Sequence, residues 1–219
     1  MAVHAIAQRT CAVVLAGGRG SRMGGVDKGL QSFKGHTLAQ QALQRLRTQS
    51  AGAPGLLGIN ANRHLELYAA MGVPVWHDAT PDYAGPLAGF LAALQLCQVP
   101  ETQMDYVLTV PCDSPLFPLD LLERLAQALT DTQADIAMVS APERNSDGST
   151  TLRRQPVFCL VKAHLFSSLQ DFVDAGGSKI FAWVQQHRYA EVPFERAGDD
   201  ANAFFNANTL AQLQQLEQS

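Results

Sequence analysis

The amino-acid sequence predicts an α/β fold in which a mostly parallel sheet carries helices on both faces. Short β-branched apolar runs alternate along the chain with longer segments of helical spacing. The short runs are almost continuously apolar, which is typical of strands that are buried on both faces of a parallel sheet. We expect the 219 residues to form one domain, with its core spanning about residues 11–219.

Hydrophobic spacing and turn residues locate the individual elements. The runs CAVVL (11–15) and YVLTV (106–110) are the clearest strands, and Pro111 ends the second. Gln212 follows Thr209 at the spacing of a helix capping box. We expect strands at 11–15, 56–59, 73–76, 106–110, 136–139 and 157–161, and helices at 37–48, 87–96, 119–129, 164–173, 180–186 and from about 209. The polar stretch 143–155 is expected to be a surface loop.

Charge and composition exclude some classes of partner. The net charge is −4 and the pI is about 5.8, whereas proteins that bind nucleic acid or a membrane surface need a basic face. We therefore expect neither partner, and we expect a monomer. The first ten residues are too polar for a secretory signal, and no apolar run approaches the roughly 20 residues that span a bilayer. Both observations predict a cytoplasmic protein.

The sequence lacks the motifs of several other kinds of site. The four cysteines form no C-x-x-C pair, so small buried thiols are a better interpretation than a redox centre. The histidines form no H-x-x-x-H or H-E-x-x-H, and there is no G-x-S-x-G. Zinc hydrolysis and a serine–histidine mechanism are set aside for these reasons.

Polar residues follow four of the expected strands. The segments are 16–28, 60–63, 77–78 and 111–115. Because ligands of open parallel sheets bind at the carboxyl ends of the strands, we expect these segments to meet at one edge and form a site.

The first of these segments suits a phosphate group. Between Gly17 and Lys28 it holds five glycines and three cations, which are Arg19, Arg22 and Lys28. Glycines let backbone N–H groups approach an anion, and the cations neutralise its charge. The segment has no G-x-x-x-x-G-K-[ST] sequence, so it is not a P-loop. A flexible connector with solvated cations is the alternative.

Asp113 is the sharpest candidate for a metal ligand. It follows an apolar strand, and Pro111 and Pro115 restrict the backbone on either side of it. Mg²⁺ takes one or two carboxylates together with phosphate oxygens and water, so Asp113 could hold a metal that bridges nucleotide phosphates. The alternative is a turn aspartate that caps the following helix.

Other polar residues at strand ends leave two interpretations open. Asn60, Asn62 and Asp78 can read a base or a ribose, and an aspartate can pair with the donor edge of guanine, but all three also form turns. Asn206 and Asn208 lie between an aromatic pair, expected in the core, and the last helix. They either point toward a ligand or belong to the start of that helix, with Asn208 or Thr209 as its N-cap.

These residues together resemble the molybdenum cofactor guanylyltransferases. The segment LAGGRGSRMGGVDKGL (15–30) is similar to the glycine-rich signature of that family, and the segments 60–63, 83–89, 111–115 and 205–209 extend the likeness from about residue 11 to the end. The resemblance implies a three-layer, Rossmann-like nucleotidyltransferase fold. It also implies transfer of GMP from GTP to the terminal phosphate of Mo-molybdopterin, with release of pyrophosphate.

The resemblance also assigns roles to residues. It implies that GTP is bound by Leu15, Ala16, Gly17, Lys28, Asn60, Asp78 and Asp113. Asp113 would also bind Mg²⁺, and Lys28, Arg22 and Asp113 would carry the catalysis. Asn206, Asn208 and Arg154 are expected on the pterin side, although the two asparagines could instead lie near the metal. Molybdoenzymes or their chaperones are expected to receive the product.

Two other functions compete with this interpretation. Related cytidylyltransferases usually carry L-A-A-G, so Gly17 favours guanine, but a CTP-dependent molybdopterin enzyme or another small-molecule nucleotidyltransferase is the alternative within enzymes. A noncatalytic adaptor that binds nucleotide and cofactor belongs to a different class, and it would release no pyrophosphate.

Overall fold

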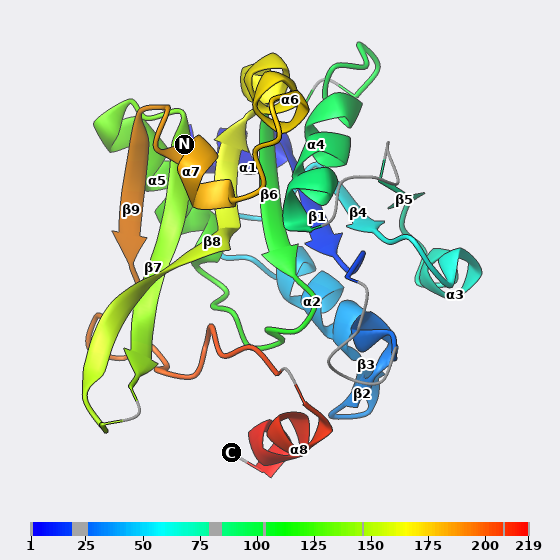
Figure 1. Ribbon diagram of the computed structural model, residues 1–219, viewed down its shortest axis with the longest axis vertical. Coiled ribbons are helices and arrows are strands. Elements are labelled where there is room, and N and C mark those ends of the chain that lie inside the picture. The colour runs from blue at the N-terminus through cyan, green and yellow to red at the C-terminus, as the bar shows by residue number, and fades with distance from the viewer. Residues whose placement is uncertain are drawn as a thin grey trace.

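A seven-stranded sheet forms the centre of the computed structural model, which describes residues 2–18, 26–78, 85–102, 104–145, 147–207 and 209–218 (Figure 1). The strand order is β5-β4-β1-β6-β8-β7-β9. The strands are β1 (Thr10–Leu15), β4 (Leu56–Asn60), β5 (Val75–Trp76), β6 (Tyr106–Pro111), β7 (Ile136–Arg144), β8 (Thr150–Lys162) and β9 (Tyr189–Pro193). All strands except β8 run parallel to one another, which confirms the expected mostly parallel sheet.

Helices cover both faces of this sheet. They are α1 (Ala2–Gln8), α2 (Leu38–Arg47), α3 (Leu65–Ala69), α4 (Pro86–Leu96), α5 (Leu121–Thr132), α6 (Phe166–Asp174), α7 (Ile180–Val184) and α8 (Leu210–Gln218), with 3₁₀ turns η2 (Lys28–Leu30) and η3 (Ala163–Leu165). Apolar residues of α1, α2 and α5 pack on one face, and those of α4, α6 and α7 pack on the other. Figure 1 shows the second group on the near side of the sheet.

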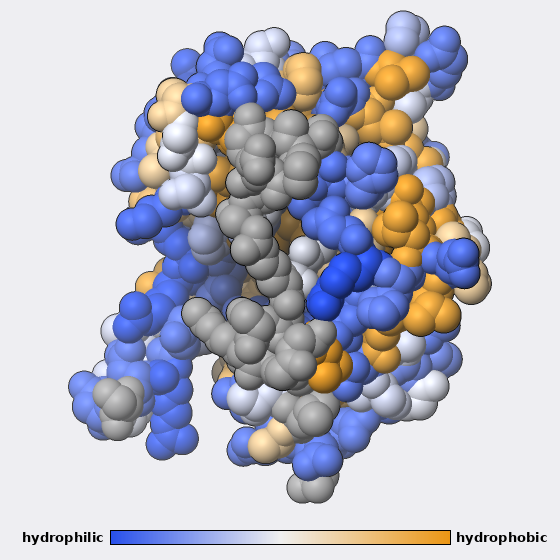
Figure 2. Space-filling view, turned by 45° about the vertical axis from the view of Figure 1, so that its right-hand side comes forward, coloured by the Kyte–Doolittle hydropathy of each residue, from blue (hydrophilic) through white to orange (hydrophobic). Residues whose placement is uncertain are grey.

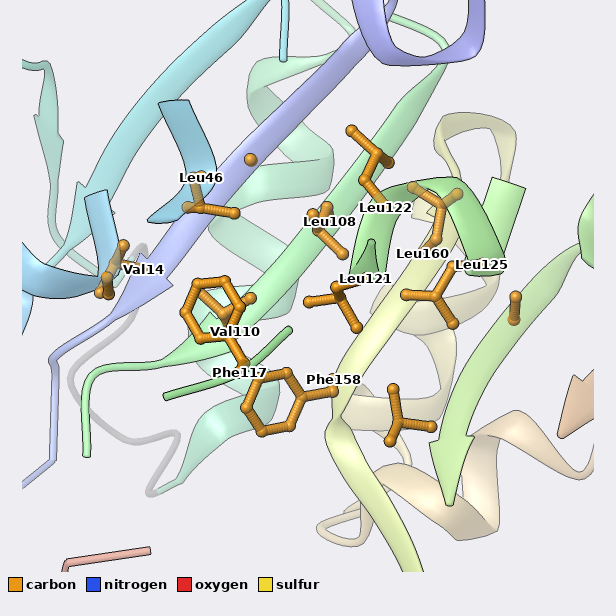
Figure 3. Packing of buried hydrophobic residues seen from close by; sticks show 14 of the residues in the cluster. Val14, Leu46, Leu108, Val110, Phe117, Leu121, Leu122, Leu125, Phe158 and Leu160 are labelled. Atoms are coloured by element: carbon orange, nitrogen blue, oxygen red, sulfur yellow. The ribbon is translucent and has the colours of Figure 1, made fainter. Parts of the chain in front are cut away.

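The two faces explain why the central strands are almost continuously apolar. In β1 all six residues are buried, with Ala12 and Val14 facing α2 and α5 while Cys11 and Val13 face α4. Figure 3 shows the first of these cores, where Val110 of β6 and Phe158 of β8 lie among side chains from α2 and α5. A strand that must satisfy two apolar layers has no polar positions to alternate, as the sequence predicted.

The prediction of a surface loop at 143–155 is wrong. Those residues that the structure describes extend β7 and β8, which stay paired from Ser140 opposite Arg154 to Arg144 opposite Thr150. The hairpin projects beyond the sheet at lower left in Figure 1, and its surface in Figure 2 is almost entirely hydrophilic. Since neither side of the hairpin's outer part is buried, no alternation of apolar and polar residues marks its strands.

Several short elements escaped the hydrophobic analysis. These are α1, α3, β9 and a small hairpin of β2 (Ser32–Phe33) and β3 (His36–Thr37). Lys34 and Gly35 form the turn of that hairpin with φ of 48° and 82°. Each element spans seven residues or fewer, which is too short for a periodic pattern to stand out.

Two further expectations concern cysteines and membrane spans. All four cysteines are free, and Cys11, Cys112 and Cys159 are buried, as small core thiols should be. Among the helices in the described ranges, none combines the length and apolarity needed to cross a bilayer.

Candidate functional site

The carboxyl ends of four parallel strands lie in register at one edge of the sheet. Leu15 at the end of β1 pairs with Asn60 of β4 on one side and with Pro111 of β6 on the other, and Asn60 pairs with Trp76 of β5. The next residues continue this contact, because Ala16 N donates to Asn60 O at 2.8 Å and Cys112 N donates to Leu15 O at 3.2 Å. Segments that are far apart in sequence therefore begin side by side, as predicted.

Lys28 and Asp113 meet at this edge. The Lys28 Nζ atom donates to Asp113 Oδ2 at 3.0 Å, and each side chain is only 20% exposed. The last residue of the segment 16–28 and the carboxylate after β6 thus lie in direct contact. Helix α5 begins at Leu121 and has Asp120 at its N-cap, so the alternative role of Asp113 as a helix cap does not apply.

Buried hydrogen-bonding groups hold the turn that carries Lys28. Asp27 is the N-cap of η2, and its Oδ1 atom accepts from Gly29 N at 3.2 Å and from the Tyr68 hydroxyl at 2.5 Å. Tyr68 comes from α3 and is fully buried. The pKa of Tyr68 is raised chiefly by burial and secondly by the hydrogen bond to Asp27. The hydroxyl therefore keeps its proton and acts as a donor.

Two asparagine amides hold Asp78 at the β4–β5 side of the edge. Asn60 Nδ2 donates to Asp78 Oδ1 at 2.9 Å, and Asn62 Nδ2 donates to Asp78 Oδ2 at 2.6 Å. Asp78 N in turn donates to Asn62 Oδ1 at 2.9 Å. Each carboxylate oxygen thus accepts one amide proton and keeps a further lone pair for a ligand.

Two glycines allow this cluster to pack closely against the first strand. A Cβ atom at Gly17 would lie 2.9 Å from Asn62 Nδ2 and 3.1 Å from Asn60 Oδ1. A Cβ atom at Gly89 of α4 would lie 2.7 Å from both Asn60 Oδ1 and Leu15 Cδ2. Gly17, the first glycine of the L-A-G-G segment, therefore leaves room for the amides that orient Asp78.

The segment after β9 brings Asn206 to the end of β6. Ser114 Oγ donates to Asn206 Oδ1 at 2.5 Å, and Ala207 N donates to the backbone oxygen of Asp113 at 2.9 Å. Phe204 anchors the segment through ring contacts at 5.0 Å with Phe158 and at 5.0 Å with Phe194. Asn206 therefore stands beside the candidate metal ligand.

The structure resolves part of the uncertainty about this segment. Thr209 and Gln212 form the predicted capping box of α8. Of the aromatic pair expected in the core, Phe204 is buried but Phe205 is 40% exposed.

One predicted site residue, Arg154, is not brought into the cluster, and two others cannot be placed. Arg154 of β8 pairs with Glu191 of β9 at 2.7 Å and stacks on Phe181 of α7, with 4.5 Å between its Cζ atom and the ring centroid. These partners lie toward the opposite edge of the sheet from β4. Arg22 and Asn208 lie outside the described residues.

The oxygen donors at this edge suit a hard cation that arrives with a nucleotide. Within the described ranges no group of three or more histidine, cysteine, aspartate or glutamate side chains could hold a metal. The single carboxylate of Asp113 with the amide oxygen of Asn206 beside it nevertheless fits Mg²⁺, which takes its other ligands from phosphates and water. Burial raises the pKa of the neighbouring Cys112 thiol, so the thiol stays protonated and does not compete as a ligand.

Analysis of the sequence alone missed part of the site. No sequence pattern singles out Tyr68, and the sequence gives Asn62 no more weight than Asn60 or Asp78. Tyr68 carries no local signal, because a tyrosine in an unrecognised five-residue helix resembles any other core residue. Asn62 could have been ranked higher from its position two residues after Asn60, which places both amides at the same strand end.

Comparison with known proteins gives a consistent result over most of the chain. Residues 12–192 match the model of the MobA-like NTP transferase domain. The chain is 56% identical over 206 residues to a molybdenum cofactor guanylyltransferase of an Acidovorax species, with 94% of this chain and 93% of that protein covered. It is 55% identical over 211 residues to a protein of the same name from Albidiferax ferrireducens, covering 96% and 97% of the two chains.

A solved structure supports the fold. The molybdopterin-guanine dinucleotide biosynthesis protein A of Archaeoglobus fulgidus superposes with a TM-score of 0.72, covering 95% of this chain and 97% of that one, at 19% sequence identity. The likeness extends to the whole three-layer arrangement.

Proposed function

The chain belongs to the molybdenum cofactor guanylyltransferase family, and we propose that it transfers GMP from GTP to the terminal phosphate of Mo-molybdopterin and releases pyrophosphate. The contact of 3.0 Å between Lys28 Nζ and Asp113 Oδ2 at the carboxyl edge of the sheet carries the proposal. A cation for phosphates and a carboxylate for a metal must lie close together if they are to act on one triphosphate, and the contact between Lys28 and Asp113 supports these roles.

The reaction is a single displacement at phosphorus. An ionised oxygen of the acceptor phosphate bonds to the α-phosphorus of GTP, and the bond from that phosphorus to the oxygen bridging to the β-phosphate breaks. The electron pair leaves with pyrophosphate. Because the acceptor already carries a charged nucleophile, the protein needs neither a general base nor a covalent intermediate. Its residues position the reactants and stabilise charge.

The phosphate end of the pocket would be served by Lys28, Arg22 and Asp113. Lys28 is placed to exchange its carboxylate partner for phosphate oxygens, and Arg22 is proposed to bind the same phosphates. Asp113 would hold Mg²⁺, with Asn206 beside it. When bound, the metal draws charge from the phosphates and favours departure of pyrophosphate.

The base end would be served by Asp78 and its two amides. The Watson–Crick edge of guanine offers two neighbouring N–H donors, which match the two oxygens of a carboxylate. Cytosine presents an acceptor where guanine has its ring N–H, so a fixed carboxylate disfavours CTP. Asn60 and Asn62 leave the Asp78 oxygens able to accept these donors, which supports GTP as the donor nucleotide.

Pyrophosphate release tests the proposal directly. We expect release from GTP but not from CTP, and only when molybdopterin and Mg²⁺ are present. Lys28→Ala and Asp113→Ala should each lower turnover at least ~100-fold, as expected for the loss of one preorganised electrostatic group. Arg9→Ala serves as a matched control, because its ion pair with Asp105 is about half exposed, with side chains 57% and 45% accessible, at the opposite end of the sheet.

The same assay separates the competing functions. Faster turnover with CTP would identify a cytidylyltransferase. Binding of GTP without any pyrophosphate release would identify a noncatalytic adaptor. Delivery of the product to molybdoenzymes or their chaperones follows from the proposed activity and would be seen as product transfer to an apo-enzyme.

A further inference from the structure

We propose that Tyr68 is a positioning residue for Lys28, because its buried hydroxyl fixes the turn at residues 27–29 and thereby sets the place of the Lys28 ammonium. The inference rests on the proposed role of Lys28 in GTP turnover. It adds a residue that touches neither the nucleotide edge nor the metal ligand with its own polar group, and that acts through the turn alone.

The first step is the bond between Tyr68 and Asp27. The Tyr68 side chain has no exposed surface, and its hydroxyl donates to Asp27 Oδ1 at 2.5 Å. Asp27 itself is only 7% exposed. A buried carboxylate oxygen is held firmly by a buried hydroxyl, since neither group can turn to water without moving the chain.

The second step is that this one oxygen links the residues on either side of Lys28. Asp27 Oδ1 also accepts from the backbone N–H of Gly29 at 3.2 Å, so the residues before and after Lys28 are tied to the same atom. The lysine side chain is long and flexible, and its backbone must therefore be fixed if the ammonium is to stand at one place. The tie between Asp27 and Gly29 provides this restraint, and Tyr68 holds the oxygen at its centre.

The third step is the space around Gly29. A Cβ atom there would lie 2.3 Å from the Tyr68 hydroxyl oxygen, 3.1 Å from its ring carbon Cζ and 3.2 Å from Ala16 Cβ. The hydroxyl therefore occupies the volume that any side chain at position 29 would need. The turn at Gly29 is thus packed closely against both Tyr68 and Ala16, the residue that follows β1.

The chief test removes the hydroxyl and keeps the ring. We expect Tyr68→Phe to lower kcat about tenfold, because small misplacements of a catalytic group have large effects on rate. If Tyr68 acts through Lys28, the same change in a Lys28→Ala background should lower the residual kcat less than about twofold. A purely structural role would give the same factor in both backgrounds.

A second variant displaces the hydroxyl without deleting it. Gly29→Ala should lower kcat about tenfold in the wild type but less than about threefold in the Tyr68→Phe background, where the atom nearest to the new methyl group is gone. Should Tyr68→Phe fail to fold, Gly29→Ala in the wild-type and Lys28→Ala backgrounds provides the same comparison. Circular dichroism and thermal unfolding verify the fold of each variant.

Tyr106→Phe is the matched control, since Tyr106 begins β6 at the opposite end of the sheet, and its turnover should equal that of the wild type. The inference is overturned if Tyr68→Phe keeps full turnover while Lys28→Ala loses it, or if the two changes multiply. A different result marks failure of the proposed function itself: wild-type protein without GTP-dependent pyrophosphate release, or a fully active Lys28→Ala variant.

Discussion

Gly89→Ala sets two known effects against each other within one helix. Gly89 lies inside α4 and is buried, so alanine should favour the helical backbone. A Cβ atom at this position would however lie 2.7 Å from Asn60 Oδ1 and 2.7 Å from Leu15 Cδ2. Both neighbours belong to the proposed nucleotide edge. The substitution thus tests whether Asn60 and Leu15 can move away from the new methyl group while the hydrogen bonds of Asn60 are kept.

The magnitudes favour the clash. Replacing an internal helical glycine by alanine stabilises by about 1 kcal/mol. Overpacking a buried site costs about 1–3 kcal/mol. Asn60 is only 3% exposed and donates to Asp78 and to the Trp76 carbonyl, so a shift of its amide also weakens a hydrogen bond worth about 1 kcal/mol. The balance is a net loss of about 1–3 kcal/mol in the free energy of unfolding.

Urea unfolding and GTP titration measure the two consequences. We expect the lower stability given above, together with GTP affinity weakened about tenfold because Asp78 loses one of its two amide supports. Ala92→Gly, at a half-buried position of the same helix, reports the helix propensity alone and should cost about 1 kcal/mol. A Gly89→Ala protein as stable as the wild type, with unchanged GTP affinity, would refute the reasoning.

Three further outcomes are expected. Asn62→Ala should weaken GTP binding about tenfold in calorimetry, because Asp78 loses a charge-assisted hydrogen bond of 2.6 Å; unchanged affinity would contradict its role. Arg124→Met should lower the free energy of unfolding by about 2–3 kcal/mol, because the Arg124 side chain is only 5% exposed and its removal leaves its carboxylate partner without a cation. Arg9→Met removes an exposed ion pair and should cost less than about 1 kcal/mol. A hydrogen bond from a lysine holds the pKa of Asp135 below its ordinary value of 3.8. The stability advantage of the wild type over Asp135→Asn should therefore be full near pH 6 and should vanish as the pH falls below 3.8. Urea unfolding across this range would show a constant difference in stability if the hydrogen bond were irrelevant.

The sheet could be predicted because its strands must satisfy two apolar layers at once. β1 and β6 are buried almost throughout, so their sequences are nearly all apolar; the buried hydroxyl of Thr109 in β6 donates to Val157 O at 2.7 Å. The outer part of the β7–β8 hairpin has no such requirement, and its pairing depends on a partner strand and on a register shift between Met138 and Val139. Neither condition leaves a local pattern in the sequence, so the polar composition of this stretch predicts a loop instead.

The site could be predicted to the extent that topology alone assembles it. Parallel strands place the residues that follow them at one edge, and this brought Lys28, Asp113, Asn60 and Asp78 together as the sequence suggested. Tyr68 could not be found in this way. Its contribution depends on a hydrogen bond to a residue 41 positions earlier and on the missing side chain at Gly29, and only coordinates show either.

In the proposed function, the two ends of the site have different tasks. At the proposed phosphate end, Lys28 and Asp113 form an ion pair, which both partners would exchange for a metal-bound triphosphate. At the proposed base end, Asp78 is held by the buried amide of Asn60 and the exposed amide of Asn62, whose bonds need not change when a nucleotide enters. Groups that change partners during the reaction contribute to the transition state, whereas groups that remain fixed contribute equally to the bound nucleotide and to the transition state. Substitutions around Lys28 should therefore appear mainly in kcat, and substitutions around Asp78 mainly in the affinity for GTP and its preference over CTP.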